Sequence, residues 1–285
     1  MKKLLILFVV VLTIVSCKRK DKNKFDDSVP KTHQELYGNW IGSFKAEKFK
    51  EGEDFSYYTK INIKITGINS NNQVQGLSIV AGNKVPFEGT YNEAAMKFIL
   101  KEMGNNKYNG VFEFSIVGKD SAEGLWNAND STIIVTQRTF SIHKKEFIYN
   151  QNLMLPEPEE GPYKDYVNVV KKTFKNIDST DYSERAYRSA TDAVIKINAS
   201  TTQLMEDSLK NLKKLDLEII RNTIYARHGF TFSSRVARQF FDEVEWYVPI
   251  SDNVEHDLTP LEKKNIALLQ RFEKYAEDNY DTFGR

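Results

Sequence analysis

Arg227 and His228 stand side by side in the sequence and are the residues best suited to acid–base chemistry or anion binding. Histidine can act as a general base at neutral pH, but it needs a nucleophile within reach. The nearest hydroxyl groups, in the Ser233-Ser234 pair, are better suited to cap a following helix, and the sequence has no G-x-S-x-G motif. We therefore favour a structural role for Arg227 and His228 at a helix end. The sequence predicts no catalytic residues.

The histidines also give no metal-binding pattern. His33, His143, His228 and His256 lie far apart in the sequence, and neither H-E-x-x-H nor C-x-x-C occurs. A glycine-rich phosphate loop is absent as well. We expect no metal and no cofactor, and a hydrolase is the least favoured function.

A set of polar and aromatic residues around His228 is better suited to binding. The forked donors of an arginine match a carboxylate, and an aromatic face can stack on a sugar ring. The Trp-Tyr pair could instead fill the core of a small helical bundle, which we favour. As a hypothesis, the binding residues are Arg221, Asn222, Tyr225, Arg227, His228, Trp246 and Tyr247.

Helices must position these residues, and the sequence marks where they begin and end. Residues 216–229 are predicted to form one helix, with Asp216 as its N-cap and Gly229 in the left-handed conformation at its end. Its apolar residues fall on two faces, which predicts packing inside a small bundle. A second helix is predicted after the Ser233-Ser234 pair. A third begins at residues 259–262, a capping box with proline at the first helical position.

Residues 225–229 spell Tyr-Ala-Arg-His-Gly, the motif for which the YARHG domain is named. The chain resembles this family over residues 204–273, including Ile220-Arg221-Asn222, Trp246-Tyr247 and Asn265-Ile266. The resemblance implies an extracytoplasmic bacterial domain that binds something at the cell surface or wall. It brings no catalytic residues. We place this domain at residues 204–278.

Residues 36–150 show short alternating segments separated by Gly, Asn and Asp. Residues 57–65 alternate apolar and polar side chains with the period of a half-buried strand, and residues 111–117 and 132–142 are similar. About eight strands are predicted, without a long helix between them, so neighbouring strands should be antiparallel.

Glycines inside these predicted strands permit the strong coiling of a small closed barrel. Closure would also remove the exposed edges of an antiparallel sheet. Gly38-Asn39-Trp40 and Gly124-Leu125-Trp126 resemble motifs of lipocalin-like barrels. A β-sandwich is the alternative.

Met1-Lys2-Lys3 precedes an apolar run that ends at Ser16-Cys17, which is the layout of an export signal. The run is short for a membrane span. Its ending resembles a bacterial lipobox, in which the cysteine thiol receives a diacylglyceryl group and becomes the first residue of the mature chain. Cys17 is the only cysteine, so no disulfide is expected. We expect residues 1–17 to be a lipoprotein signal peptide with Cys17 as the lipidation site. An uncleaved anchor or an ordinary secretory signal is the alternative.

The other segments connect these parts. Residues 18–35 are charged and are expected to form a flexible tether. Residues 151–203 begin with a proline-rich linker, after which we predict a short helix at 166–174 and a strand at 193–197. The predicted fold is therefore α+β with two domains, an antiparallel lipocalin-like barrel followed by a small, mostly helical YARHG domain.

These features predict a non-catalytic lipoprotein of the bacterial cell envelope, held by its lipid to the outer membrane or cell surface. The net charge of +1 argues against a nucleic-acid partner. In the favoured hypothesis the YARHG domain binds peptidoglycan or a surface glycan, and the β domain is a scaffold or small-ligand pocket. The alternative is a lipocalin-like carrier of an apolar ligand, anchored by the helical domain. A packed barrel interior favours the first hypothesis, and an open apolar one favours the second.

Overall fold

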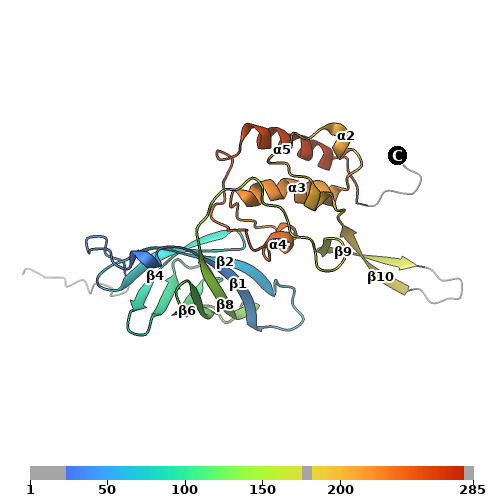
Figure 1. Ribbon diagram of the computed structural model, residues 1–285. Coiled ribbons are helices and arrows are strands. Elements are labelled where there is room, and N and C mark those ends of the chain that lie inside the picture. The colour runs from blue at the N-terminus through green and yellow to red at the C-terminus, as the bar shows by residue number, and fades with distance from the viewer. Residues whose placement is uncertain (1–23, 175–181, 279–285) are drawn as a thin grey trace, which may run out of the picture.

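The computed structural model describes residues 24–174 and 182–278, which form a β-barrel and a helical domain (Figure 1). The predicted signal peptide with Cys17 lies outside the described residues, as does the first part of the predicted tether. No helix in these two ranges is both long and apolar enough to cross a membrane.

Eight antiparallel strands close into a barrel, and each pairs with its neighbours in sequence. Because β8 also pairs with β1, the sheet has no free edge. The predicted eight-stranded antiparallel barrel is confirmed, and the β-sandwich alternative is wrong. The strands are β1 (Gly38–Phe49), β2 (Tyr58–Ile68), β3 (Gln73–Val80), β4 (Asn83–Asn92), β5 (Lys97–Glu102), β6 (Gly110–Val117), β7 (Ser121–Ala128) and β8 (Val135–Lys145), preceded by a short 3-10 helix at Gln34–Leu36.

Aromatic side chains fill much of the barrel interior. Tyr91 stacks on Phe98 with 4.5 Å between ring centroids, and Phe98 stacks on Phe114 at 4.8 Å. Phe140 meets Phe114 edge-on at 5.7 Å, and Trp40 is only 1% exposed. The middle of the barrel is therefore a packed core, which favours a scaffold over a carrier of a large apolar ligand.

The helical domain is built around two antiparallel helices, α3 (Lys214–Arg227) and α5 (Pro260–Glu273). A third helix, α4 (Arg235–Phe241), lies between α3 and the barrel (Figure 1). Two short helices, α1 (Ala193–Lys196) and α2 (Glu206–Leu209), complete the domain. The expectation of a small, mostly helical C-terminal domain is confirmed.

The segment between the two domains differs from the sequence prediction. Strands β9 (Lys164–Phe174) and β10 (Tyr182–Ser189) form an antiparallel hairpin that projects from the helical domain (Figure 1). The predicted helix at 166–174 is therefore wrong, because the valines of this segment favour extended backbone. The predicted strand at 193–197 is also wrong, because Ala193–Lys196 is helical.

The start of α3 also differs from the prediction, because Asp216 is not the N-cap. The helix begins at Lys214, and Asp216 is its third residue. The carboxylate is fully buried and accepts hydrogen bonds from the backbone N–H of Lys213 at 3.0 Å and of Thr191 at 2.6 Å. Asp216 therefore joins the start of α3 to the segment that leads into α1.

The predicted capping box at the start of α5 is confirmed. The Thr259 hydroxyl accepts a hydrogen bond from the Glu262 N–H at 3.2 Å, and the Glu262 carboxylate accepts one from the Thr259 N–H at 2.9 Å.

The loop that follows α4 docks on the outer face of β2. Asn62 points outward from the barrel yet is completely buried, and its amide donates to the Pro249 carbonyl at 2.8 Å. The Lys60 ammonium, also buried, donates to the carbonyls of Val244 and Tyr247. Since buried polar groups must be paired to be tolerated, these contacts fix how the two domains meet.

We expect Asn62→Leu to weaken this docking. The Pro249 carbonyl would lose its donor, which should lower the free energy of unfolding by about 1–3 kcal/mol. Calorimetry should then show a barrel transition separated from that of the helical domain. Lys64→Met, on the same face of β2, is the control. An unchanged melting profile for Asn62→Leu would show that the interface does not depend on this contact.

Candidate functional site

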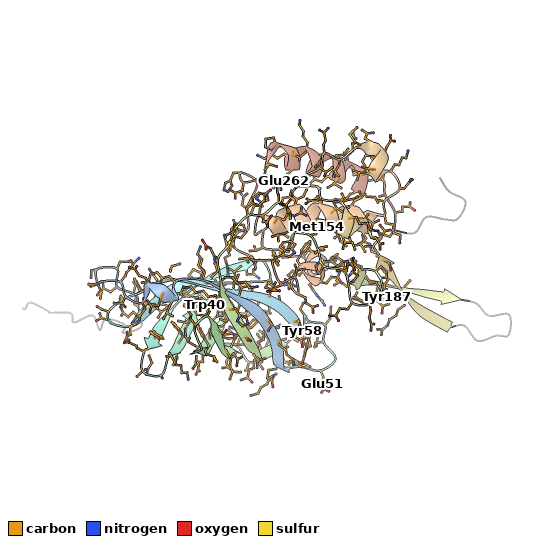
Figure 2. All side chains as sticks on the ribbon, viewed as in Figure 1. Trp40, Glu51, Tyr58, Met154, Tyr187 and Glu262 are labelled. Carbon is orange, nitrogen blue, oxygen red and sulfur yellow. The ribbon has the colours of Figure 1, made fainter. Side chains whose placement is uncertain are left out.

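Arg227 lies inside the helical domain, although the binding hypothesis needs it at the surface. It is 2% exposed, and its Nε donates to the Leu153 carbonyl at 2.6 Å. Its other guanidinium nitrogens contact the Ser200 hydroxyl at 2.9 Å and the Met154 sulfur at 3.1 Å, and Figure 2 shows Met154 beside α3. Burial lowers the pKa of Arg227 to about 10. The proposed ligand-binding role of Arg227 is therefore wrong, because its donors already hold the interdomain linker.

His228 is also inside, 5% exposed. Its Nε2 lies 2.9 Å from a carboxylate oxygen of Glu262, and its ring stacks on Tyr149 with 4.3 Å between centroids. The Tyr149 hydroxyl donates to the other Glu262 oxygen at 3.0 Å. Burial acts to raise the pKa of Glu262, but hydrogen bonds from His228, Ser200 and the Thr259 N–H lower it to about 2. Glu262, labelled at the start of α5 in Figure 2, is therefore a buried anion held by its partners.

The side chains of Arg227 and His228 are thus engaged within the domain. We expected a structural role at the helix end, and both residues do lie there. Their partners are distant segments, however, and not the last carbonyls of α3. Gly229 adopts a left-handed conformation with φ of 72°, as predicted. A Cβ atom at Gly229 would also lie 2.6 Å from Ile250.

Trp246 and Tyr247 pack against the domain core. Tyr247 is 1% exposed, and its hydroxyl donates to the Phe230 carbonyl at 2.6 Å. Trp246 is half-buried, and its indole N–H donates to the Met154 carbonyl at 2.7 Å. These contacts support the favoured packing role for the pair over sugar stacking.

The three remaining candidates, Arg221, Asn222 and Tyr225, lie together on the outer side of α3 and line one groove. The groove has a volume of about 530 Å³ and is bounded by α3, the segment before α4, and the base of the β9–β10 hairpin. It also contains Phe230 and Asn168, which the sequence analysis did not select. The structure thus brings together three of the seven predicted residues, each of them partly exposed.

Aromatic rings form a continuous strip in this groove. The rings of Tyr225 and Phe230 are 5.7 Å apart, and Phe230 meets Phe232 edge-on at 5.2 Å. Tyr225 and Phe230 are half-buried, so each ring keeps part of its surface open to solvent. The amide of Asn222 lines the same groove. Such a surface offers apolar faces next to hydrogen-bonding groups.

The arginines of the groove are already paired with acids. Arg221 makes a two-point contact with Glu273, at 2.6 and 3.1 Å. Arg188 contacts Asp165, Glu218 and Asp278, at 3.2, 2.8 and 2.6 Å. Burial alone would lower the pKa of Arg188, but the hydrogen bonds that it donates to Asp278 and Glu218 raise it. The idea that Arg221 grips a ligand carboxylate is therefore not supported, because its donors are engaged.

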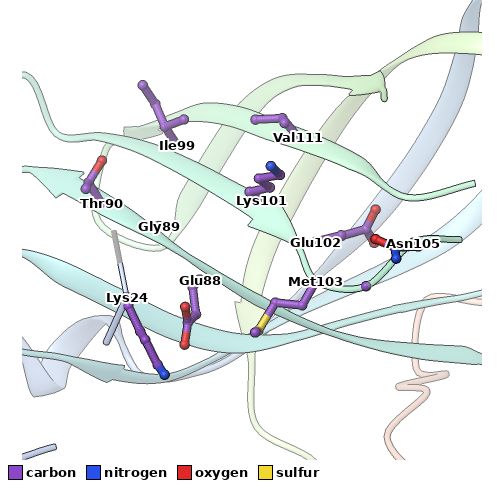
Figure 3. A pocket seen from close by; sticks show the side chains of 11 residues that line it. Lys24, Glu88, Gly89, Thr90, Ile99, Lys101, Glu102, Met103, Asn105 and Val111 are labelled. Carbon is purple, nitrogen blue, oxygen red and sulfur yellow. The ribbon is translucent and has the colours of Figure 1, made fainter. Parts of the chain in front are cut away.

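Two other surface features lie outside this groove. Figure 3 shows a depression of about 490 Å³ on the outer side of β4 and β5, lined by side chains such as Glu88, Ile99, Lys101 and Met103. Exposed apolar and charged side chains of this kind are common on protein surfaces. The depression holds no cluster of groups that could act together.

Ser121 and His143 form a hydrogen-bonded pair at 2.9 Å. A serine next to a histidine is the nucleophile and base arrangement of many hydrolases. The pair lies on the exposed side of the β7–β8 ladder, where the residues face each other as cross-strand neighbours. No carboxylate among the described residues orients this histidine. Within the same ranges no group of three or more metal-binding side chains occurs. We assign no chemistry to the pair.

The two long helices with their capping box, the left-handed Gly229 and the buried Arg227 and His228 all lie within residues 192–274, which match the family model of the YARHG domain. The chain carries a YARHG domain. The match begins earlier than the predicted start at residue 204 and takes in α1, which the contact between Thr191 and Asp216 ties to α3. No curated protein matches the chain. In this YARHG domain the motif residues mainly stabilise the fold, and only Tyr225 also lines the groove.

Replacing Glu262 by glutamine should destabilise the YARHG domain by about 3 kcal/mol at neutral pH, because it replaces a buried carboxylate whose charge is met by hydrogen-bond donors from the protein. The pKa of Glu262 is about 2, below its ordinary 4.5, so its contribution is complete above pH 4.5 and is lost as the pH falls toward 2. Stability should therefore depend less on pH across this window in the variant. Denaturant unfolding followed by circular dichroism measures both effects.

The matched control for Glu262→Gln is Asp257→Asn, an exposed acid in the preceding loop. Its unfolding midpoint should stay within experimental error of the unchanged protein. If Glu262→Gln and the protein without substitutions had the same unfolding midpoint at pH 7, the stability of the domain would not depend on this carboxylate.

Proposed function

We propose that this protein is a non-catalytic lipoprotein of the bacterial cell envelope, and that its YARHG domain binds a neutral glycan segment of a wall or surface polymer. The observation that carries the binding proposal is the groove on α3, where the partly open rings of Tyr225 and Phe230 lie next to Asn222. Sugar rings present apolar C–H faces and hydroxyl groups, which match aromatic faces and amides respectively.

The charges of the groove favour a neutral ligand. Its lining includes Arg188 and Arg221, and also Glu218 and Glu255, so the formal charges cancel. Each arginine is already held by acids in the same domain. A strongly acidic polymer or the carboxylates of a stem peptide would have to break these pairs. We therefore favour the glycan strand of peptidoglycan, or a neutral surface glycan, over acidic partners.

In this proposal the barrel is the scaffold that carries the YARHG domain. Its packed aromatic core supports this role, as does the burial of Asn62 and Lys60 against the helical domain. The packed middle of the barrel leaves little room there for the large apolar ligand of the alternative hypothesis.

The envelope location rests on the sequence before the barrel. The apolar run up to Ser16 and the single Cys17 are typical of a lipoprotein signal, and a lipid on Cys17 would hold the protein at a membrane surface. The absence of any other cysteine means that the mature fold needs no disulfide.

The groove predicts that Tyr225→Leu and Asn222→Ala each reduce retention on purified peptidoglycan or envelope glycan. Loss of an aromatic face or an amide contact should weaken binding about tenfold. Because the proposed ligand is neutral, added salt should change binding of the unchanged protein little. Pull-down of the full chain in detergent, with melting curves for each variant, measures this.

Tyr275→Leu is the control, since Tyr275 is 75% exposed and lies outside the groove. It should bind as the unchanged protein does. If folded Tyr225→Leu and Asn222→Ala were retained as well as the protein without substitutions, the groove would not be the glycan-binding site. Binding that salt abolishes would point to an acidic polymer.

The anchoring proposal predicts that Cys17→Ala releases the protein from membranes. Mass spectrometry of the unchanged protein should find a diacylglyceryl group on Cys17, and fractionation should recover it with membranes. Ser16→Ala keeps the thiol and a small residue before it, and should leave membrane association intact. An unmodified Cys17 in membrane-bound protein would contradict lipidation.

A further inference from the structure

One end of the barrel opens into a cavity of about 700 Å³, separate from the YARHG groove. This is the end with the β1–β2 loop, where Figure 2 labels Glu51. The lining combines aromatic rings with charged side chains. Phe44, Phe112 and Trp126 are among the rings, and the charged side chains are Glu102, Arg138 and Lys84, of which Lys84 already pairs with Asp252 at 2.6 Å.

Glu102 belongs to the floor of this cavity and is 6% exposed. One carboxylate oxygen accepts from the Ser78 hydroxyl at 2.5 Å. The other accepts from the Gly110 N–H at 2.7 Å and from the indole N–H of Trp126 at 3.1 Å. Burial raises the pKa of Glu102, while these donors oppose that effect. The carboxylate thus has three donors from the protein, and it fixes the Trp126 ring in the cavity wall.

Arg138, like Glu102, has no charged partner among the described residues. Its guanidinium donates to three backbone carbonyls, those of Phe44 at 3.2 Å, Ser56 at 3.1 Å and Tyr57 at 3.4 Å. It also lies 5.1 Å from the centre of the Phe44 ring. No carboxylate among the described residues is within ion-pair distance of it.

The surroundings of Arg138 make the lack of a negative partner energetically unfavourable. Burial, together with the positive charge of Arg238, lowers the pKa of Arg138 to about 10. A largely buried cation without an anion is unfavourable, and an anionic ligand would remove that penalty. The Arg138 guanidinium contacts backbone carbonyls in β1 and just before β2. Glu102 is on β5, which is four strands from β1 in the closed barrel. A ligand anion at Arg138 would therefore sit away from Glu102.

From this arrangement we propose that the barrel mouth binds a small monocarboxylate with an apolar or aromatic body. The ligand carboxylate pairs with Arg138, and its body lies against Phe44, Phe112 and Trp126. Glu102 holds Trp126 in place and disfavours a second negative charge on the ligand. This site is independent of the proposed glycan groove, so either proposal can fail without the other.

The test uses the full chain in detergent with 3-phenylpropanoate and 4-phenylbutanoate as probes, and their primary amides as neutral matches. Titration calorimetry measures affinity, and quenching of tryptophan fluorescence reports on Trp126. The acids should bind at least about tenfold more tightly than the amides. Arg138→Met should remove this difference, whereas Arg138→Lys should keep part of it.

Two further variants make the result specific. Trp126→Phe should abolish most of the ligand-induced fluorescence change while the acids still bind. Lys101→Met, on the outer side of the barrel near the mouth, should change nothing. Equal affinity for acids and amides would overturn the proposal, as would unchanged acid binding in folded Arg138→Met. Absence of saturable acid binding at about 1 mM would also overturn it.

Discussion

The contact between His228 and Glu262 is the constraint on which the YARHG domain depends. Glu262 lies in the first turn of α5 and is fully buried, so its charge must be met by donors from the protein. Those donors come from the end of α3, from Tyr149 in the linker and from the capping threonine of α5. One carboxylate therefore sets the relative position of two helices and of the chain that enters the domain. Arg227, the residue before His228, extends this network to Leu153 and Met154.

Helical geometry explains how α3 can serve both the fold and a groove. Residues three and four apart share a face of a helix, so Arg221, Asn222 and Tyr225 face outward together. Arg227, two residues after Tyr225, points the other way, into the domain, whereas His228 lies on the Arg221 side, and both Arg221 and His228 contact α5. Gly229 with positive φ turns the chain after α3, and the Phe230 ring then lies 5.7 Å from that of Tyr225. Arg227 and the open groove are thus on opposite faces of one element.

Local patterns in the sequence predicted much of the fold, and long-range pairing explains what they missed. Period-two alternation located the barrel strands, and the capping box located α5, because both signals lie within a few residues. The sequence predicts Asp216 as an N-cap and gives no sign of its contact with Thr191, which is 25 residues away. Arg188 and Arg138 gave no signal, since an arginine in a strand is ordinary until the tertiary fold buries it. The motif drew attention to Arg227 and His228, but sequence alone could not show that their partners are Leu153 and Glu262.

The β1–β2 hairpin physically links the barrel mouth to the YARHG domain. Its loop supplies carbonyls that hold Arg138, and the outer face of β2 carries Lys60 and Asn62 into the interdomain contact. The other polar links between the domains include the exposed pairs of Arg235 with Asp54 and of Lys84 with Asp252. Exposed pairs contribute little, whereas the contacts of Lys60 and Asn62 are buried and directional. Buried polar contacts between the barrel strands and the YARHG domain thus come from this hairpin, at Lys60 and Asn62.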